Sequence, residues 1–156
     1  RKQHVVSKKW VKAQMAAGKL KFKKFTCGLD TSYSSKSPDT IAMIFQGITE
    51  DRKLITLSEK VYNNSKLDIP LAPSDTAVKF VGFLEQCRKD WGFAKDVYID
   101  NADQATITEL RMIDTYWSDH CRLRAACIIF TIPTSDRRFW TVSTCSWAGY
   151  SRAVTW

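Results

Sequence analysis

Two short apolar runs that each end in an aspartate constrain the fold of this chain more than any other feature. Residues 25–30 and 96–100 are mostly hydrophobic, and their last residues are Asp30 and Asp100. Runs of this length and composition are typical of buried β-strands. The chain therefore has two predicted strands, far apart in the sequence, that each place a carboxylate at the strand end.

The stretch between these two strands predicts a hairpin followed by a helix. Residues 40–49 and 54–62 are rich in β-branched and aromatic residues and flank a polar turn, as in an antiparallel hairpin. Residues 74–92 carry apolar side chains at helical spacing, with Ser74 as the expected N-cap. A second helix is expected at residues 102–112. The predicted order is β-β-β-α-β-α.

This order has a chemical consequence for the two aspartates. If the strand ending at Asp100 returns by a right-handed crossover and lies parallel to the strand ending at Asp30, both carboxylates emerge at the same sheet edge. Neighbouring carboxylates repel unless a cation lies between them or one keeps its proton, and oxygen ligands suit Mg²⁺ or Mn²⁺. A divalent-metal site is therefore predicted. The alternative is structural: Asp30 begins a serine-rich turn and Asp100 caps the next helix.

Size and charge favour one domain with a polyanionic partner. The chain has 156 residues, a net charge of +8 and a pI near 9.3. Residues 1–24 hold nine Lys and Arg and no acidic residue, and they predict a short helix with an apolar side that ends near Gly18. This basic arm is interpreted either as a solvated linker from a longer protein or as a hinge that contacts phosphates.

Cysteine spacing and hydropathy indicate a cytosolic protein without a membrane partner. The five cysteines include no CxxC pair, so free thiols in a reducing compartment are expected. The longest apolar runs, such as residues 125–130, are too short to cross a bilayer, and the first residues lack the apolar stretch of a secretion signal.

Two segments resemble a known family. Residues 27–34 with residues 37–42 (CGLDTSYS and SPDTIA) resemble the opening strand of the nuclease domain in large terminase subunits of tailed bacteriophages, where a small-residue turn follows a Gly-hydrophobic-Asp. Residues 97–110 (VYIDNADQATITEL) resemble the segment that delivers the second catalytic Asp of that family, with another acid three positions later. The resemblance covers about residues 22–112.

The resemblance implies an α/β fold of the RNase H-like type and a metal-dependent endonuclease. The implied sheet is mixed, with its first three strands antiparallel and helices at its flanks, and the implied domain spans residues 25–156. Asp30 would bridge two Mg²⁺ or Mn²⁺ ions, Asp100 would hold one of them, and Asp103 would be an auxiliary ligand or a support for the ligands. One ion would activate a water and the other would stabilise the departing 3′ oxygen.

The resemblance also implies partners and a location. The substrate would be concatemeric double-stranded viral DNA, cut during genome packaging in the cytoplasm of the infected bacterial host. The portal and the small terminase subunit would be partners, as would the ATPase domain of the same full-length protein. No glycine-rich phosphate loop occurs here, so the chain is expected to be a fragment that begins in the linker between ATPase and nuclease. Four lysines are expected to bind DNA: Lys21, Lys23, Lys24 and Lys36.

The distal part of the chain departs from the family pattern. The family has a third acid in a downstream helix, and no such motif occurs here; Asp114, Asp119 and Asp136 are the remaining acids. Residues 1–112 contain fifteen Lys, whereas residues 113–156 contain none. Three explanations stay open for such a break: an atypical C-terminal half, a disrupted reading frame, or distal residues that were assigned without a secure sequence. A fifth strand is still expected at residues 125–132.

Two further functional classes stay open at this point. The chain could be a non-catalytic RNase H-like module that binds DNA or a packaging protein through its basic arm. It could also be related to Holliday-junction resolvases or transposases, because the same fold places acids similarly and a fold alone does not decide function.

Overall fold

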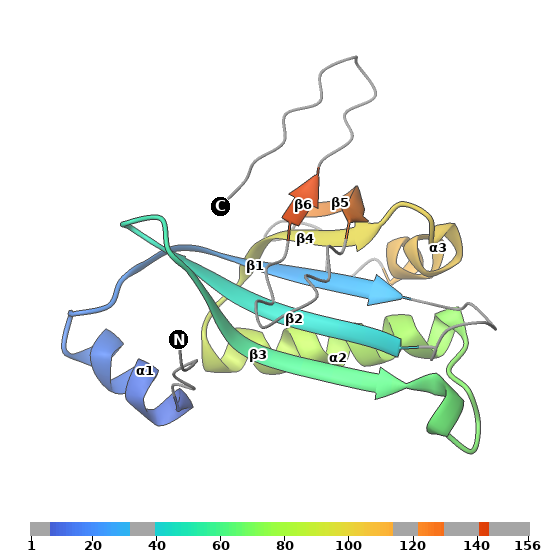
Figure 1. The fold of residues 1–156 in the computed structure, drawn as a ribbon, viewed down its shortest axis with the longest axis horizontal. Helices are drawn as coiled ribbons and strands as arrows, with labels where there is room; N and C mark the ends of the chain where they lie inside the picture. The colour runs from blue at the N-terminus through green and yellow to red at the C-terminus, as the bar shows by residue number, and fades with distance from the viewer. Residues whose placement is uncertain (1–6, 32–39, 114–121, 130–140, 144–156) are drawn as a thin grey trace, which may run out of the picture.

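The described residues form one mixed sheet with helices packed on it (Figure 1). The computed structural model describes residues 7–31, 40–113, 122–129 and 141–143. Their six strands lie in the order β3-β2-β1-β4-β5-β6. The strand bounds are Phe22–Thr31 for β1, Thr40–Thr49 for β2, Leu54–Asn63 for β3, Ala94–Asp100 for β4, Arg122–Ile129 for β5 and Thr141–Ser143 for β6.

The first three strands are antiparallel neighbours, as predicted. β1 pairs with β2, and β2 pairs with β3 through a short turn. In this turn Arg52 adopts a left-handed backbone with φ of 63°. The Thr49 hydroxyl accepts a hydrogen bond from the backbone N–H of Lys53 at 2.9 Å, and this contact closes the turn. The hairpin expected around residues 50–53 is therefore confirmed.

The crossover to β4 changes the sheet from antiparallel to parallel. β4 lies parallel beside β1, and β5 lies parallel beside β4. The short β6 is antiparallel to β5. The order β-β-β-α-β-α is thus confirmed, and so is a mixed α/β sheet. The strand expected at residues 125–132 begins earlier, at Arg122.

Helix α2, Pro73–Asp90, connects the hairpin to β4, and its start differs from the prediction. The N-cap is Ala72, so the expectation of Ser74 is wrong. Pro73 occupies the first helical turn, where its fixed φ is favourable and its missing N–H is not needed. The Asp75 side chain accepts a hydrogen bond from the Ala72 N–H at 3.1 Å. The expected end near Gly92 is confirmed, because Gly92 has a φ of 122°.

Helix α3, Gln104–Met112, follows β4, and a single 3₁₀ turn, Asn64–Lys66, follows β3. α3 begins two residues later than predicted, because Asp103 is its N-cap. The Asp103 carboxylate accepts a hydrogen bond from the Thr106 N–H at 3.0 Å. The alternative in which Asp100 caps this helix is therefore wrong.

The hydrophobic core lies between the sheet and helices α2 and α3. Alternate residues of the central strands face the helices, since side chains alternate across a strand. These residues and their helical partners are fully or almost fully buried: Leu29, Ile41, Met43, Phe45, Val97 and Ile99 from the sheet, with Phe80, Leu84, Ile107 and Leu110 from the helices. The aspartates that follow Leu29 and Ile99 therefore belong to the opposite face.

The basic arm is packed against the domain in its described part. Helix α1, Lys8–Ala16, buries Val11 in the same core and ends before Gly18, which has a φ of 70°. The ammonium groups of Lys8 and Lys12 lie 5.9 and 5.5 Å from the centre of the Trp91 ring. The predicted helix is confirmed. Of the residues expected on its apolar side, Val11 and Met15 pack on the core, whereas Trp10 is 52% exposed and residues 5 and 6 lie outside the described residues.

The state of the cysteines and the hydropathy of the helices can be examined in the described residues. Cys27 and Cys87 are free thiols, and both are buried. In the described part of the chain, none of the helices is sufficiently long and apolar to cross a membrane.

Candidate carboxylate site at the sheet edge

The structure brings Asp30 and Asp100 together. The parallel register of β1 and β4 runs to the pair Leu29 and Ile99, so the two aspartates follow this pair on neighbouring strands. Neighbouring strands lie about 4.8 Å apart, and side chains alternate between the two faces of a sheet. Because Leu29 and Ile99 are paired, the residues that directly follow them, Asp30 and Asp100, lie on the same face. The ends of β1 and β4 point to the same edge in Figure 1. The predicted juxtaposition of the two strand ends is confirmed.

The electrostatics of the pair are those of two carboxylates that share a site. Burial, and next to it the negative charge of Asp100, raise the pKa of Asp30 to about 6. Within the described residues, no group donates a hydrogen bond to the Asp30 carboxyl. Asp100 accepts one hydrogen bond, from the Ala102 N–H to Oδ1 at 3.0 Å, which leaves its second oxygen free in this part of the chain. The pair thus has oxygen atoms that a cation could bind.

Asp30→Asn should stabilise the fold at pH 8 and have little effect at pH 4. The unfolded chain ionises Asp30 near its usual pKa of 3.8, whereas the folded chain does so only near 6. The folded state therefore loses stability as the pH rises through this interval, and the neutral amide avoids that loss. In metal-free buffer at pH 8, we expect the thermal midpoint of the variant to exceed that of the wild type by about 2 to 5 °C. Thermal unfolding at both pH values measures the difference; a destabilised variant at pH 8 would refute it.

Asp103 lies at the same edge but is already engaged by protein groups. One oxygen caps α3 through Thr106, and the other accepts a hydrogen bond from the Thr31 hydroxyl at the end of β1. The side chain is buried. These bonds join the end of β1 to the start of α3 and so fix the β4-α3 turn beside Asp30. The expected role of Asp103, either as a metal ligand or as a support for the ligands, stays a prediction. Because both of its carboxylate oxygens accept hydrogen bonds from the protein, its contacts fit the role of a support.

The lysines expected to bind DNA do not lie beside the carboxylates. Lys21, Lys23 and Lys24 lie just before β1 or in its first residues, and Asp30 lies near its end. With a rise of about 3.3 Å per residue, Lys24 is roughly 20 Å from Asp30 along the strand. Lys24 also lies 3.7 Å from the buried Asp96 carboxylate. Lys36 lies outside the described residues.

A third acid is not found in the part of the chain that the structure describes. No group of three or more His, Cys, Asp or Glu that could hold a metal ion occurs there. The three distal acids that remained as candidates, Asp114, Asp119 and Asp136, lie outside the described residues. The described donor set for a cation therefore consists of Asp30 and Asp100, with Asp103 adjacent.

Sequence reasoning missed two features of this edge. The first is the hydrogen bond from Thr31 to Asp103, which depends on the turn after β4. The second is a cluster of Lys60, Tyr62 and Lys79, in which both ammonium groups lie near the tyrosine ring. Tyr62 could be placed near a strand end from the sequence, but nothing in the sequence indicated that a lysine of α2 packs on it.

Comparisons with known proteins add little to this geometry. No protein-family model matches the chain, and no curated protein matches it. Among solved structures, the catalytic domain of human Endonuclease V is similar, with 10% sequence identity and a TM-score of 0.30. The match covers 49% of this chain and 33% of that domain. A similarity this low carries no argument about fold family or activity, so the case for a function depends on the site itself.

Proposed function

We propose that this chain is an RNase H-like nuclease domain that hydrolyses DNA with divalent metal ions held by Asp30 and Asp100. The observation that carries the proposal is the pairing of these two carboxylates at the ends of parallel strands β1 and β4. The strand order β3-β2-β1-β4-β5, with β2 antiparallel to its neighbours, supports the RNase H-like assignment.

The donor set fits a hard divalent cation. Two carboxylates on one face, one of them with a raised pKa and no hydrogen-bond donor in the described part of the chain, are energetically unfavourable without a cation between them. Carboxylate oxygens are the ligands that Mg²⁺ and Mn²⁺ prefer. Bound at Asp30 and Asp100, two such ions would supply Lewis acidity toward a phosphodiester and lower the pKa of a water molecule.

The protein contributes position and charge to this chemistry. The rigid register of β1 and β4 holds the two carboxylates on one face. The Asp103 carboxylate holds Thr31 and the first turn of α3, and this contact keeps the edge in place. No protein nucleophile is required, because water is the attacking group in a metal-dependent hydrolysis.

The biological setting that we propose follows the resemblance of residues 27–42 and 97–110 to large terminase subunits of tailed bacteriophages. The substrate is concatemeric double-stranded viral DNA, cut in the cytoplasm of the infected host. The ATPase domain of the same polypeptide, the portal and the small terminase subunit are the proposed partners. A third acid from the distal residues would complete the metal site.

The proposal is tested by incubating the protein with supercoiled plasmid and Mg²⁺ or Mn²⁺, with and without EDTA. We expect nicked and linear DNA with either metal and intact plasmid in EDTA, because the carboxylate pair cannot polarise a phosphodiester without a cation. A sample that binds the plasmid but leaves it intact with both metals contradicts the nuclease proposal. That result would favour a non-catalytic DNA-binding module.

A further inference from the structure

Helix α1 is attached to the rest of the domain by little apolar packing and by a cluster of charges. Of its nine residues, all of which the structure describes, Val11 alone is buried, and Met15 packs partly on the core. Helix α3 has the same length and buries three residues. The Asp90 carboxylate at the end of α2 forms ion pairs with the ammonium groups of Lys8 and Lys12, at 2.5 and 3.5 Å. These ion pairs therefore have a larger share in holding α1 than charges have in holding α3.

The charges in this contact are unfavourable for the helices that carry them. Helix α1 begins with Lys8 and Lys9 and has no acidic residue in its first turn, although the N-terminal end of a helix carries partial positive charge. Asp90 is the last residue of α2, where the helix end carries partial negative charge. Each helix end is therefore destabilised by its own charge and stabilised by the charge on the other helix. Loss of the contact would leave both ends uncompensated.

Helix α1 would not persist without this contact. Isolated helices shorter than about 12 to 15 residues are marginal in water, and α1 has nine. Detachment and unfolding of α1 are therefore a single event. The side chains of Lys8 and Lys12 are 50% and 47% exposed, so dissolved salt screens their attraction to Asp90. The stability of α1 should thus depend on salt more steeply than the stability of the sheet.

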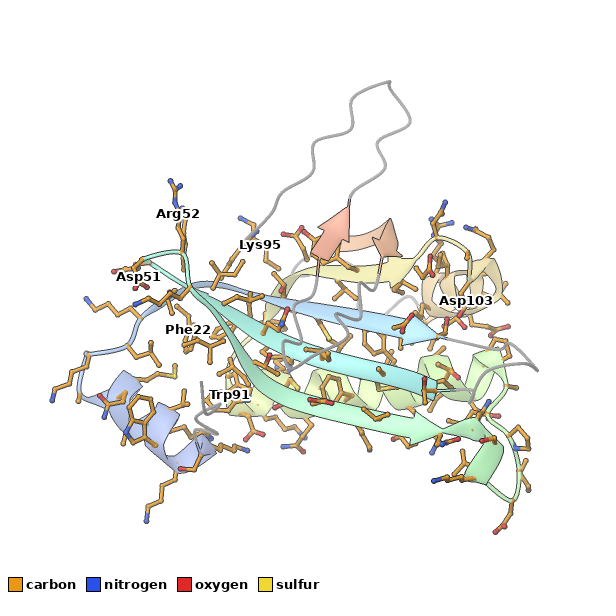
Figure 2. All side chains as sticks on the ribbon, in the orientation of Figure 1. Phe22, Asp51, Arg52, Trp91, Lys95 and Asp103 are labelled. Atoms are coloured by element: carbon orange, nitrogen blue, oxygen red, sulfur yellow. The ribbon has the colours of Figure 1, made fainter. Side chains whose placement is uncertain are left out.

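We infer that α1 is a charge-gated latch, which is closed while Asp90 holds Lys8 and Lys12 and opens as one unit when these charges are screened or removed. The sheet stays folded on opening, because its buried residues pack on α2 and α3. Opening uncovers the ring of Trp91, which lies near α1 in Figure 2 and is 7% exposed in the closed state. The inference does not depend on the proposed nuclease function, since the latch lies at the start of β4 and the carboxylate pair at its end.

The test is hydrogen exchange of the full chain, measured by mass spectrometry on peptides that cover residues 7–20, at about 50 and 500 mM salt. The exchange rate of this segment measures the open fraction of the latch when closing is faster than chemical exchange. The test variant is Asp90→Asn, which removes the central charge. The control is Asp68→Asn, which makes the same change of charge at an exposed position before α2. Peptides from β1 and β4 report on the sheet.

In the wild type we expect exchange of residues 7–20 to rise about threefold between the two salt concentrations. Asp90→Asn should exchange about tenfold faster than the wild type at low salt and change little at high salt, because its ion pairs are already lost. Asp68→Asn should match the wild type. Unchanged exchange in Asp90→Asn would mean that apolar packing alone holds α1, and an equal increase in the β4 peptides would indicate general destabilisation; either result would overturn the inference.

A charge-swapped variant separates gating by charge from simple loss of a contact. Lys8→Glu and Lys12→Glu combined with Asp90→Lys keep opposite charges across the contact and place each charge on the helix end that favours it. We expect this variant to exchange residues 7–20 no faster than the wild type, whereas Asp90→Lys alone should exchange faster than Asp90→Asn. Exchange in the swapped variant as fast as in Asp90→Lys alone would show that these charges do not control α1.

Discussion

Replacing Asp30 by asparagine should lower metal-dependent cleavage of plasmid DNA by more than about a hundredfold, and Asp100→Asn should do the same. Loss of a group that only orients a metal ligand commonly costs 10- to 100-fold in affinity or activity, and loss of a ligand itself costs more. Both carboxylates are proposed ligands of the same ions, so the double variant should be no worse than the stronger single variant. Initial rates of nicking in Mn²⁺ measure the effect.

The matched control for these variants is Asp68→Asn. Asp68 is an exposed aspartate between the 3₁₀ turn and α2, and it has no hydrogen bond or ion pair to another described residue. Its substitution makes the same change of charge, and we expect cleavage within about twofold of the wild type. Full activity of Asp30→Asn or Asp100→Asn would show that these carboxylates do not carry the reaction, while an equal loss in Asp68→Asn would indicate a general effect of charge.

Phe80→Ala should give a large loss of stability, about 3 to 5 kcal/mol. The Phe80 side chain is 0% exposed and lies in the cluster that joins α2 to the sheet and to α3. Its removal leaves a cavity between these layers, and a small domain is stable by only about 5 to 15 kcal/mol in total. Urea unfolding followed by circular dichroism measures the change.

Val78→Ala on the same helix is the control for this prediction. Val78 is 65% exposed, so its truncation removes little buried surface. We expect a change within about 0.5 kcal/mol. Comparable losses in both variants would mean that α2 does not pack on the sheet through Phe80.

The sequence predicted the elements that have strong local patterns. Residues 25–30 and 96–100 are short apolar runs bounded by polar segments, which favours strands. β1 and β4 contain both runs but begin earlier, at Phe22 and Ala94. Their parallel pairing was expected from a right-handed crossover through the helix between them. The turn at residues 50–53 was equally clear, because polar residues separate two β-branched runs. Asp30 and Asp100 could therefore be placed together from the sequence.

Side-chain contacts between different helices and strands could not be predicted from the sequence. Pro73 overrode the preference of Ser74 for the N-cap, and the displaced cap at Asp103 shifted the start of α3. The Thr31 hydrogen bond to Asp103 and the contact of Lys79 with Tyr62 each join residues that are distant in the chain. Such contacts depend on the exact approach of two elements, and no local periodicity encodes that approach.

Two basic residues of the arm contact the rest of the domain. Lys8 and Lys12 of the arm pair with Asp90 and lie near the Trp91 ring, so these two charges attach α1 to the end of α2. Figure 2 shows Arg52 and Lys95 at the end of the sheet opposite Asp103.

A crystal structure of the protein soaked in Mn²⁺, with anomalous diffraction recorded at the manganese edge, tests the central claim most directly. The account predicts manganese bound by oxygen atoms of both Asp30 and Asp100, with Asp103 still hydrogen-bonded to Thr31. Anomalous density absent from this pair at a saturating concentration of Mn²⁺, or carboxylates that point to opposite faces of the sheet, would contradict it.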